Sequence, residues 1–216
     1  PRAAAADLVH LDPRRHRGRT AVLLVHGYFC NAGFWHDWRR RGGGPDRPHV
    51  AVSLGPAAGS IDRMTCRLDA AIRRVHDQTG VPVVIVAHSL GGLVVRAWWR
   101  QHASWADAAV ARVVTLGSPH RGTALAAWAM SALGRAMRTD SVWLRALATD
   151  EPPGRAARFL CCYTDCDNVV FPPHCARLPG APAHLVSGAA HIAMASRPAV
   201  HALVDRVIDE AEQRRD

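Results

Sequence analysis

The stretch V-V-I-V-A-H-S-L-G-G at residues 83–92 joins an apolar run to a tight turn centred on Ser89. The apolar run is typical of a strand buried on both faces, and a helical pattern follows the turn. A serine exposed on such a turn needs small neighbours, and Ala87 and Gly91 stand two positions on either side of it. Gly92 allows the following helix to pack closely. The stretch therefore predicts that Ser89 is a nucleophile at the N-terminus of a helix.

A second apolar run, Ala21–His26, leads into the string H-G-Y-F at residues 26–29. The loop after this predicted strand is placed to supply one N–H group of an oxyanion hole, and Tyr28 is the candidate donor. The other candidate donor is the N–H of Leu90, because backbone N–H groups at a helix N-terminus hold negative charge. Phe29, in the first of these loops, is expected to contact the substrate.

Several strings follow one another in order along the chain: V-H-G-Y, A-H-S-L-G-G, L-G-S-P-H-R-G-T, Y-T-D-C-D-N-V-V-F-P and G-A-A-H. Together they resemble the bacterial true lipases and their short esterase relatives in the α/β-hydrolase superfamily, over roughly residues 20–205. The main departure is Ala87, where the motif usually has Gly, a change that some bacterial lipases also show. The resemblance implies an α/β fold with a mostly parallel sheet flanked by helices. It also implies hydrolysis of carboxylic esters through an acyl-enzyme on Ser89.

A serine hydroxyl is a weak nucleophile at neutral pH and needs a general base, for which the chain offers 13 histidines. His191 follows the last predicted strand, precedes the last predicted helix and comes after the small residues 187–190, which is where this fold places its base. His88 and His26 are interpreted as structural residues. His120 is expected to line the cleft, among the substrate-binding residues, or to pack beneath it. The alternative for His191 is an ordinary histidine of a surface loop.

The base in turn needs a carboxylate that orients it. The loop after the predicted strand that ends at Tyr163 offers two, Asp165 and Asp167. Both satisfy the chain order Ser, Asp, His of α/β-hydrolases. The family pattern places the acid just before an Asn/Ile/Val-type segment, which favours Asp167 in D-N-V-V, and Asp165 is the second candidate. Either aspartate could instead simply form a turn.

Strands and helices alternate along most of the chain, which predicts a parallel sheet with right-handed crossovers. The 216 residues contain no linker, repeat or low-complexity block, so a single domain over 1–216 is expected, with an irregular segment at 1–19. The predicted strands are Ala21–His26, His49–Leu54, Pro82–His88, Ala111–Leu116, Arg158–Tyr163 and Ala183–Val186. The predicted helices are Gly33–Arg40, Ser60–Thr79, Leu90–His102 and Pro198–Gln213.

The alternation breaks at residues 123–155, a helix-prone stretch with more apolar residues than two short helices need for packing. We expect a helical cap over the cleft, with Trp128 and Met137 contacting the substrate. Arg135 and Arg138 could then meet the anionic headgroups of a membrane or lipid surface. An ordinary core face is the alternative, because helical spacing of apolar residues is common in globular proteins.

The chain has six cysteines. Cys161 and Cys162 are adjacent, so in a strand they point to opposite faces and suit burial. Cys166 and Cys175 bracket the acid loop, and a disulfide between them would clamp it in an exported protein. A metal site built from Cys161 or Cys162 with Cys166, His174 and Cys175 matches no common zinc spacing, so no metal is expected. No phosphate-binding loop, dinucleotide fingerprint or EF-hand string occurs, and no cofactor is expected.

The formal net charge is +9 and all 27 basic residues are Arg. Such a charge favours nucleic acid or an anionic surface as partner. The arginines are mostly spread along the chain, and no zinc-finger or RNA-recognition pattern accompanies them, so nucleic acid is not expected. The expected partner is an ester or lipid substrate, and the sequence leaves the oligomeric state open.

The longest apolar runs, near 21–25 and 83–87, are far shorter than a membrane span, and no signal-peptide pattern occurs. Because the chain opens with Pro1, an upstream targeting segment could have been removed. The chain would then be exported or membrane-associated, and otherwise cytoplasmic.

Two alternatives to ester hydrolysis remain open at this point. The same machinery serves thioesterases and amide hydrolases. A catalytically silent protein that keeps this fold for binding is the other alternative. Labelling of Ser89 by a fluorophosphonate distinguishes an enzyme from a silent protein.

Overall fold

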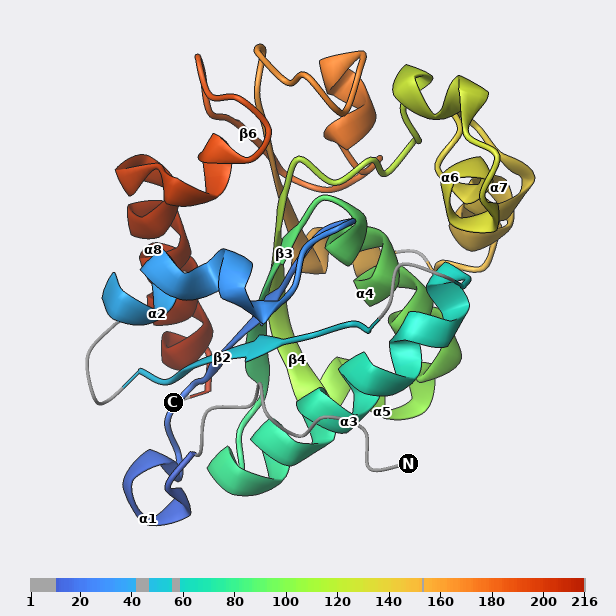
Figure 1. The fold of residues 1–216 in the computed structure, drawn as a ribbon. Coiled ribbons are helices and arrows are strands. Elements are labelled where there is room, and N and C mark those ends of the chain that lie inside the picture. Colours follow the sequence, from blue (N-terminus) through green and yellow to red (C-terminus); the bar gives the residue numbers. More distant parts are fainter. Residues whose placement is uncertain (1–10, 42–46, 56–58, 153, 216) are drawn as a thin grey trace.

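The computed structural model describes residues 11–41, 47–55, 59–152 and 154–215. A six-stranded sheet in the order β2-β1-β3-β4-β5-β6 forms its centre, and every pair of neighbouring strands is parallel (Figure 1). The strands are β1 (Val22–Val25), β2 (His49–Val52), β3 (Val83–His88), β4 (Val110–Leu116), β5 (Phe159–Tyr163) and β6 (Ala183–Leu185). Because all strands run the same way, the loops after their carboxyl ends meet along one edge of the sheet.

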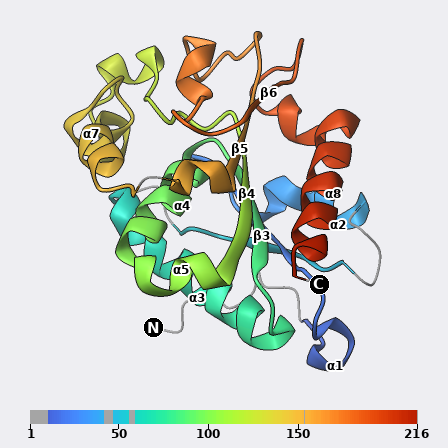
Figure 2. The ribbon, with the colours of Figure 1, turned by 180° about the vertical axis from the view of Figure 1, so that it is seen from behind.

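Helices cover both faces of this sheet, as the expected fold class requires (Figures 1 and 2). On one face lie α3 (Ile61–Thr79), α4 (Leu90–Gln101) and α5 (Ala103–Ala109), and on the other lie α2 (His36–Arg41) and α8 (Pro198–Gln213). Alternate residues of the buried strands face the two layers. In β1, Leu23 and Val25 belong to the core under α3 and α4, whereas Val22 and Leu24 belong to the core under α2 and α8. Burial on both faces explains why the strands read as continuous apolar runs.

Local sequence signals account for the ends of the two longest helices. Gly80 ends α3 in the left-handed conformation with φ 72°, and its N–H donates to the carbonyl of His76. Such a conformation costs glycine little, so it commonly ends a helix. At the start of α8, Pro198 occupies the first turn, where a missing N–H leaves no helical hydrogen bond unmade.

Some elements differ from the sequence-based expectations. Residues expected as one helix at Gly33–Arg40 form a 3-10 turn, η1 (Ala32–Trp35), followed by α2. The helix α5 was not expected, because its alanine-rich sequence has no clear apolar period. Within the N-terminal segment 1–19, expected to be irregular, a single helical turn α1 (Pro13–His16) is found, while residues 1–10 lie outside the described part of the chain.

The described residues of the stretch 123–155 form short helices and no strand of the sheet. Its elements are η2 (Ala124–Trp128), α6 (Ala132–Ala136) and α7 (Val142–Thr149), and η3 (Arg155–Arg158) begins at its end. α6 and α7 lie together at one corner of the molecule (Figures 1 and 2). Five apolar side chains among its described residues are buried, namely Ala126, Leu133, Met137, Leu144 and Leu147. Its exposed large apolar side chains include Leu125, Trp128, Met130 and Val142.

An ion pair ties this stretch to the helix that follows the serine turn. Arg96 on α4 is fully buried, and its Nε and Nη2 donate to the two carboxylate oxygens of Glu151 at 2.6 and 2.7 Å. Its Nη1 donates to the carbonyl of His120. A planar guanidinium fits a carboxylate through two parallel hydrogen bonds. This bidentate geometry makes the ion pair directional as well as strong.

Candidate active site

Ser89 stands at the junction of β3 and α4, at the carboxyl end of its strand. Its backbone is held at φ 53° and ψ −125°, a conformation that a side chain rarely adopts. The N–H of Ser89 donates to the carbonyl of Leu116 on the neighbouring strand. Strain of this kind persists only where the surrounding structure imposes it, and it is common at functional sites.

Glycines make this turn sterically feasible. A β-carbon on Gly91 would lie 2.7 Å from the carbonyl oxygen of His26 and 2.8 Å from that of Val25. A β-carbon on Gly27 would lie 2.8 Å from Cβ of Ser89. The loop after β1 therefore passes directly against the serine, which no larger residue at position 27 would allow.

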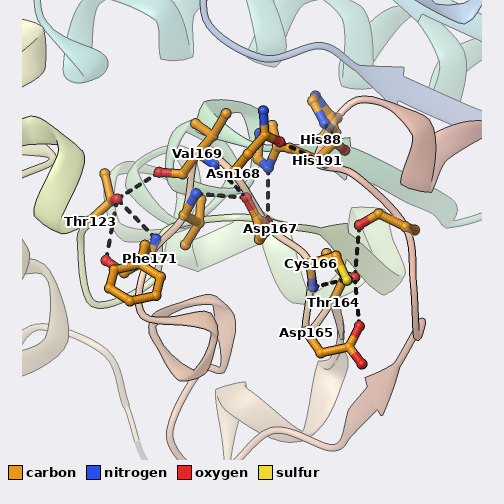
Figure 3. Close-up of polar contacts among 12 residues, drawn as sticks. His88, Thr123, Thr164, Asp165, Cys166, Asp167, Asn168, Val169, Phe171 and His191 are labelled. Atoms are coloured by element: carbon orange, nitrogen blue, oxygen red, sulfur yellow. Dashed lines mark hydrogen bonds and ion pairs between the residues drawn. The ribbon is translucent and has the colours of Figure 1, made fainter.

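His191 and Asp167 form a buried pair beside this turn. Nδ1 of His191 lies 3.0 Å from Oδ2 of Asp167, and both side chains are almost completely buried (Figure 3). A carboxylate oxygen can only accept here, so Nδ1 of His191 carries the proton and its Nε2 is left as the basic atom. A buried carboxylate that fixes the tautomer of a histidine in this way prepares it to act as a base.

The carboxylate of Asp167 is itself held in one orientation. Its Oδ1 accepts from the N–H groups of Val169 at 2.8 Å and Val170 at 2.7 Å, which leaves Oδ2 for the histidine. Burial by itself would raise the pKa of this carboxyl, but the hydrogen bonds from His191, Val170 and Val169 outweigh it and lower the pKa. Asp167 is therefore ionised at neutral pH.

Asp165, the second candidate for the acid, lies apart from the imidazole. Its side chain is exposed and accepts from Oγ of Ser187 and from the N–H of Gly188, both at 2.8 Å. These hydrogen bonds from Gly188 and Ser187 lower the pKa of Asp165. Asp165 thus binds the loop that leads to His191, whereas Asp167 binds the ring.

An apolar cavity of about 510 Å³ opens beside Ser89 and His191. Its walls come from the loop after β1, from the stretch 123–155 and from the acid loop. Lining residues from these three regions include Tyr28, Phe29, Leu125, Ala126, Met130, Gly134, Met137, Val169 and Val170. A largely apolar cavity with a few polar groups at one end is the usual form of a small-molecule site.

The two expected oxyanion donors lie on either side of the serine turn. Leu90 is the first residue of α4, so its N–H has no partner within the helix. Tyr28 lies in the loop after β1 and lines the cavity, beside Phe29 with its φ of 57°. Tyr28 and Ser89 thus line the same cavity, and Leu90 directly follows Ser89 in the chain.

The residues expected to contact the substrate fall into two groups. Phe29, which is 83% exposed, and Met137, which is buried, both line the cavity. Trp128 and His120 are not among its lining residues. The indole of Trp128 is 90% exposed on the outer surface of η2. His120 is buried below the site, with Nε2 3.0 Å from Oγ1 of Thr115.

The other two histidines of interest have structural surroundings. His26 accepts at Nε2 from the N–H of Leu54, and its Nδ1 lies 2.8 Å from the carbonyl of Gly27. His88 is buried, stacked on Phe34, and burial together with the neighbouring His191 lowers the pKa of His88 to about 3. Burial, with Arg96 nearby, also holds the pKa of His120 well below its usual value.

All six cysteines are free thiols in the structure, so Cys166 and Cys175 do not form the disulfide that was considered from the sequence. Cys161 and Cys162 are buried, and burial raises the pKa of both thiols. Among the described residues, no group of three or more His, Cys, Asp or Glu side chains could hold a metal ion. No helix of the described segments has the length and apolar character needed to cross a bilayer.

Sequence reasoning missed two residues that contact the pair. The amide of Asn168 accepts from the N–H of His191 at 3.2 Å. Gly117 packs against the imidazole, as described below. Gly117 belongs to the string L-G-S-P, but only the structure reveals that its backbone lies against the histidine.

A family described as a domain of unknown function (DUF7379) matches residues 64–163. No curated protein matches the chain.

Solved structures resemble the chain over most of its length. The mature form of lipase BlEst2 from Bacillus licheniformis has a TM-score of 0.75 and 18% identity, covering 93% of this chain and 95% of that one. A monoacylglycerol lipase from Paleococcus ferrophilus has a TM-score of 0.61 and 16% identity, covering 89% and 96%. Lipase B from Aspergillus fumigatus has a TM-score of 0.61 and 19% identity, covering 80% and 44%.

Together with the parallel sheet, these likenesses define the class: the chain has the α/β-hydrolase fold, and the expected fold class is confirmed. The similar structures are of lipolytic enzymes, as the resemblance in the sequence suggested. At these identities the likeness concerns the fold, and the chemistry has to be argued from the site.

Proposed function

We propose that this chain is a serine hydrolase that cleaves carboxylic esters, in the manner of a lipase, through an acyl-enzyme on Ser89. His191 takes the proton from the Ser89 hydroxyl as the oxygen attacks the ester carbonyl, and returns it to the leaving alcohol. Asp167 holds the imidazole and stabilises its charged form. Water activated by His191 then releases the acid and restores the serine.

The observation that carries this proposal is the buried contact of 3.0 Å between Nδ1 of His191 and Oδ2 of Asp167 beside the strained Ser89. A histidine whose Nδ1 is fixed by a carboxylate presents Nε2 to the cavity that it shares with Ser89. The strained turn places the buried serine at the wall of the cavity, and an ordinary turn would not need such strain. A merely structural histidine has no need of a doubly hydrogen-bonded, buried carboxylate.

Negative charge develops on the carbonyl oxygen during the attack, and the N–H groups of Tyr28 and Leu90 would hold it. The free N–H of Leu90 at the first turn of α4 supports this role. Leu90 belongs to α4 and directly follows the nucleophile, so its N–H would need no rearrangement during the reaction.

The apolar walls of the cavity favour an ester with an apolar acyl group. Residues 123–155 would act as a cap of the single domain, because Leu125, Ala126, Met130 and Met137 contribute to those walls. Exposed apolar side chains on the same stretch, above all Trp128, would rest on a lipid surface.

Charge supports this contact with an anionic surface. The guanidinium of Arg135 donates to the carbonyl of Met130, and that of Arg138 donates to the carbonyls of Ala126 and Ala129. Carbonyl oxygens leave the positive charge in place, so both arginines remain available to anionic headgroups.

Labelling by a fluorophosphonate, followed by peptide mass mapping, tests the function. The account predicts one labelled site, Ser89, and no labelling of Ser89→Ala, with the exposed Ser104→Ala on α5 as a matched control that labels normally. Absence of labelling in the folded wild type would identify a catalytically silent protein.

A series of p-nitrophenyl esters beside matched thioesters and amides tests which bond the enzyme prefers to cleave. Faster cleavage of thioesters or amides would contradict the ester assignment.

A further inference from the structure

We propose that His88 and Asn168 are positioning residues that fix the base His191 through its own main chain. This inference rests on the proposed function, because it concerns the residue assigned there as the general base. Asp167 holds the imidazole ring, and the two additional residues hold the peptide groups on either side of it.

The contacts form one set around His191 (Figure 3). The N–H of His191 donates to Oδ1 of Asn168 at 3.2 Å. On the other side, the carbonyl of His191 lies 3.2 Å from Nε2 of His88. With the contact to Asp167, every polar group of His191 apart from its basic Nε2 has a partner.

The carbonyl of His191 determines which ring nitrogen of His88 carries the proton. A carbonyl oxygen can only accept, so Nε2 of His88 carries the proton and donates it. Its Nδ1 is then the unprotonated nitrogen, and this atom is buried without a hydrogen-bond partner. A charged imidazolium would leave a buried donor unsatisfied at that position, so the neutral form with the proton on Nε2 fits the site.

Packing gives the ring of His88 a single orientation. It stacks on Phe34 with 4.6 Å between ring centroids, and on the other side its centroid lies 4.7 Å from that of His191. His88 is also the last residue of β3, directly before Ser89. One short stretch thus carries the nucleophile and a contact to the base, which couples their positions.

The base benefits from such support because its own loop is built from small residues. Residues 187–190 are Ser-Gly-Ala-Ala, with Gly188 at φ 67°, and small side chains contribute little packing. Asp165 and Thr164 hold the start of this loop, through Gly188 and the carbonyl of Ala189. His88 and Asn168 hold it at His191 itself, where a shift of the main chain would carry Nε2 away from the serine.

Kinetic constants of matched variants test the inference. In His88→Phe the ring stacking is kept and the donor is lost, whereas His88→Gln places a donating amide where Nε2 stood. Asn168→Ala removes the acceptor from an exposed position, so it does not threaten folding. The exposed His36→Gln on α2 is the control.

We expect kcat to fall about 10-fold in His88→Phe and Asn168→Ala, with KM within about twofold, because misplacement of a catalytic group mainly slows the chemical step.

The same experiment includes a rescue and a pH profile. His88→Gln should keep kcat within about threefold of the wild type, and the pH profile of kcat should keep its shape in all variants, because no titrating group of the reaction is lost. The inference is overturned if His88→Phe and Asn168→Ala both keep wild-type kcat, or if His88→Gln is as slow as His88→Phe. It is also overturned if KM rises together with a fall in kcat. Failure of the proposed function would look different, because Ser89→Ala would then retain turnover.

Discussion

Gly117, at the end of β4, lies directly against the imidazole of His191. A β-carbon on Gly117 would lie 3.0 Å from Nδ1 of His191 and 3.2 Å from Oδ2 of Asp167. The backbone there has φ 57°, and its N–H donates to the carbonyl of Cys162. On this side the backbone of Gly117 packs against both His191 and Asp167, and it leaves little room for a side chain.

The substitution Gly117→Ala is expected to lower kcat by about 10-fold or more, because the new methyl group would push His191 away from Asp167. The left-handed backbone would add roughly 1 kcal/mol of strain to the folded state. Steady-state kinetics and the melting temperature measure the two effects separately. A variant with unchanged kcat would show that the pair tolerates displacement and that the packing is incidental.

The two aspartates of the acid loop should differ sharply in their effect. Asp167→Asn removes the charge that stabilises the imidazolium and is expected to lower kcat by about 10⁴-fold. Asp165→Asn retains an acceptor for Ser187 and Gly188 and is expected to be mild. Parallel kinetics on both purified variants decide the matter, and the reverse ranking would transfer the role to Asp165.

Substitutions in residues 123–155 separate the cavity wall from the outer surface. Met137→Ser, inside the cavity, should weaken hydrolysis of long-chain p-nitrophenyl esters more than that of the acetate. Trp128→Ser, on the outside, should leave both soluble esters unchanged but reduce co-sedimentation with anionic vesicles. Equal losses of Met137→Ser on both esters, with a lowered melting temperature, would assign that side chain to the core. If Trp128→Ser bound vesicles as well as the wild type, Trp128 would have no role in contact with a lipid surface.

Stability should fall on mild acidification. His88 keeps its pKa at about 3 when folded, against 6.5 for an ordinary histidine, and the pKa of the buried His120 is also lowered. Below pH 6.5 the unfolded chain therefore binds more protons on these two residues than the folded chain does, down to about pH 3 for His88, so the free energy of unfolding rises with pH. The stability is complete above pH 6.5 and is lost below it, by at most about 1.4 kcal/mol per pH unit for each group.

Urea unfolding at pH 7 and pH 5 measures this loss. In His88→Gln the difference between the two pH values should shrink, because one of the two titrating groups is gone. Equal free energies of unfolding at both pH values in the wild type would contradict the assignment of buried, neutral histidines.

Much of the fold could be predicted because local signals and burial agree in the sequence. Pro198 marks the start of α8, Gly80 marks the end of α3, and each central strand reads as a continuous apolar run. The helix α5 escaped prediction because Ala103–Ala109 has neither a strong apolar period nor a capping signal. Its existence depends on packing against β4 and α3, which local sequence does not encode.

The candidate site was predictable where chemistry restricts the residue type and less so where packing decides. Ser89, Asp167 and His191 follow from the strings around them and from their order in the chain. The spacing of apolar residues could not distinguish the exposed Trp128 from the buried Met137, since both lie on short elements of one stretch. Contacts made through the main chain, such as that between Asn168 and His191, leave no trace in a single sequence.

Turnover of an ester by Ser89→Ala is the most direct test of the central claim that Ser89 is the nucleophile. Alanine fits the turn sterically, so circular dichroism and the melting temperature should match the wild type. We expect a loss of kcat of roughly 10³-fold or more, with any residual rate due to binding and the oxyanion donors. Turnover by the correctly folded variant at the rate of the wild type would contradict it.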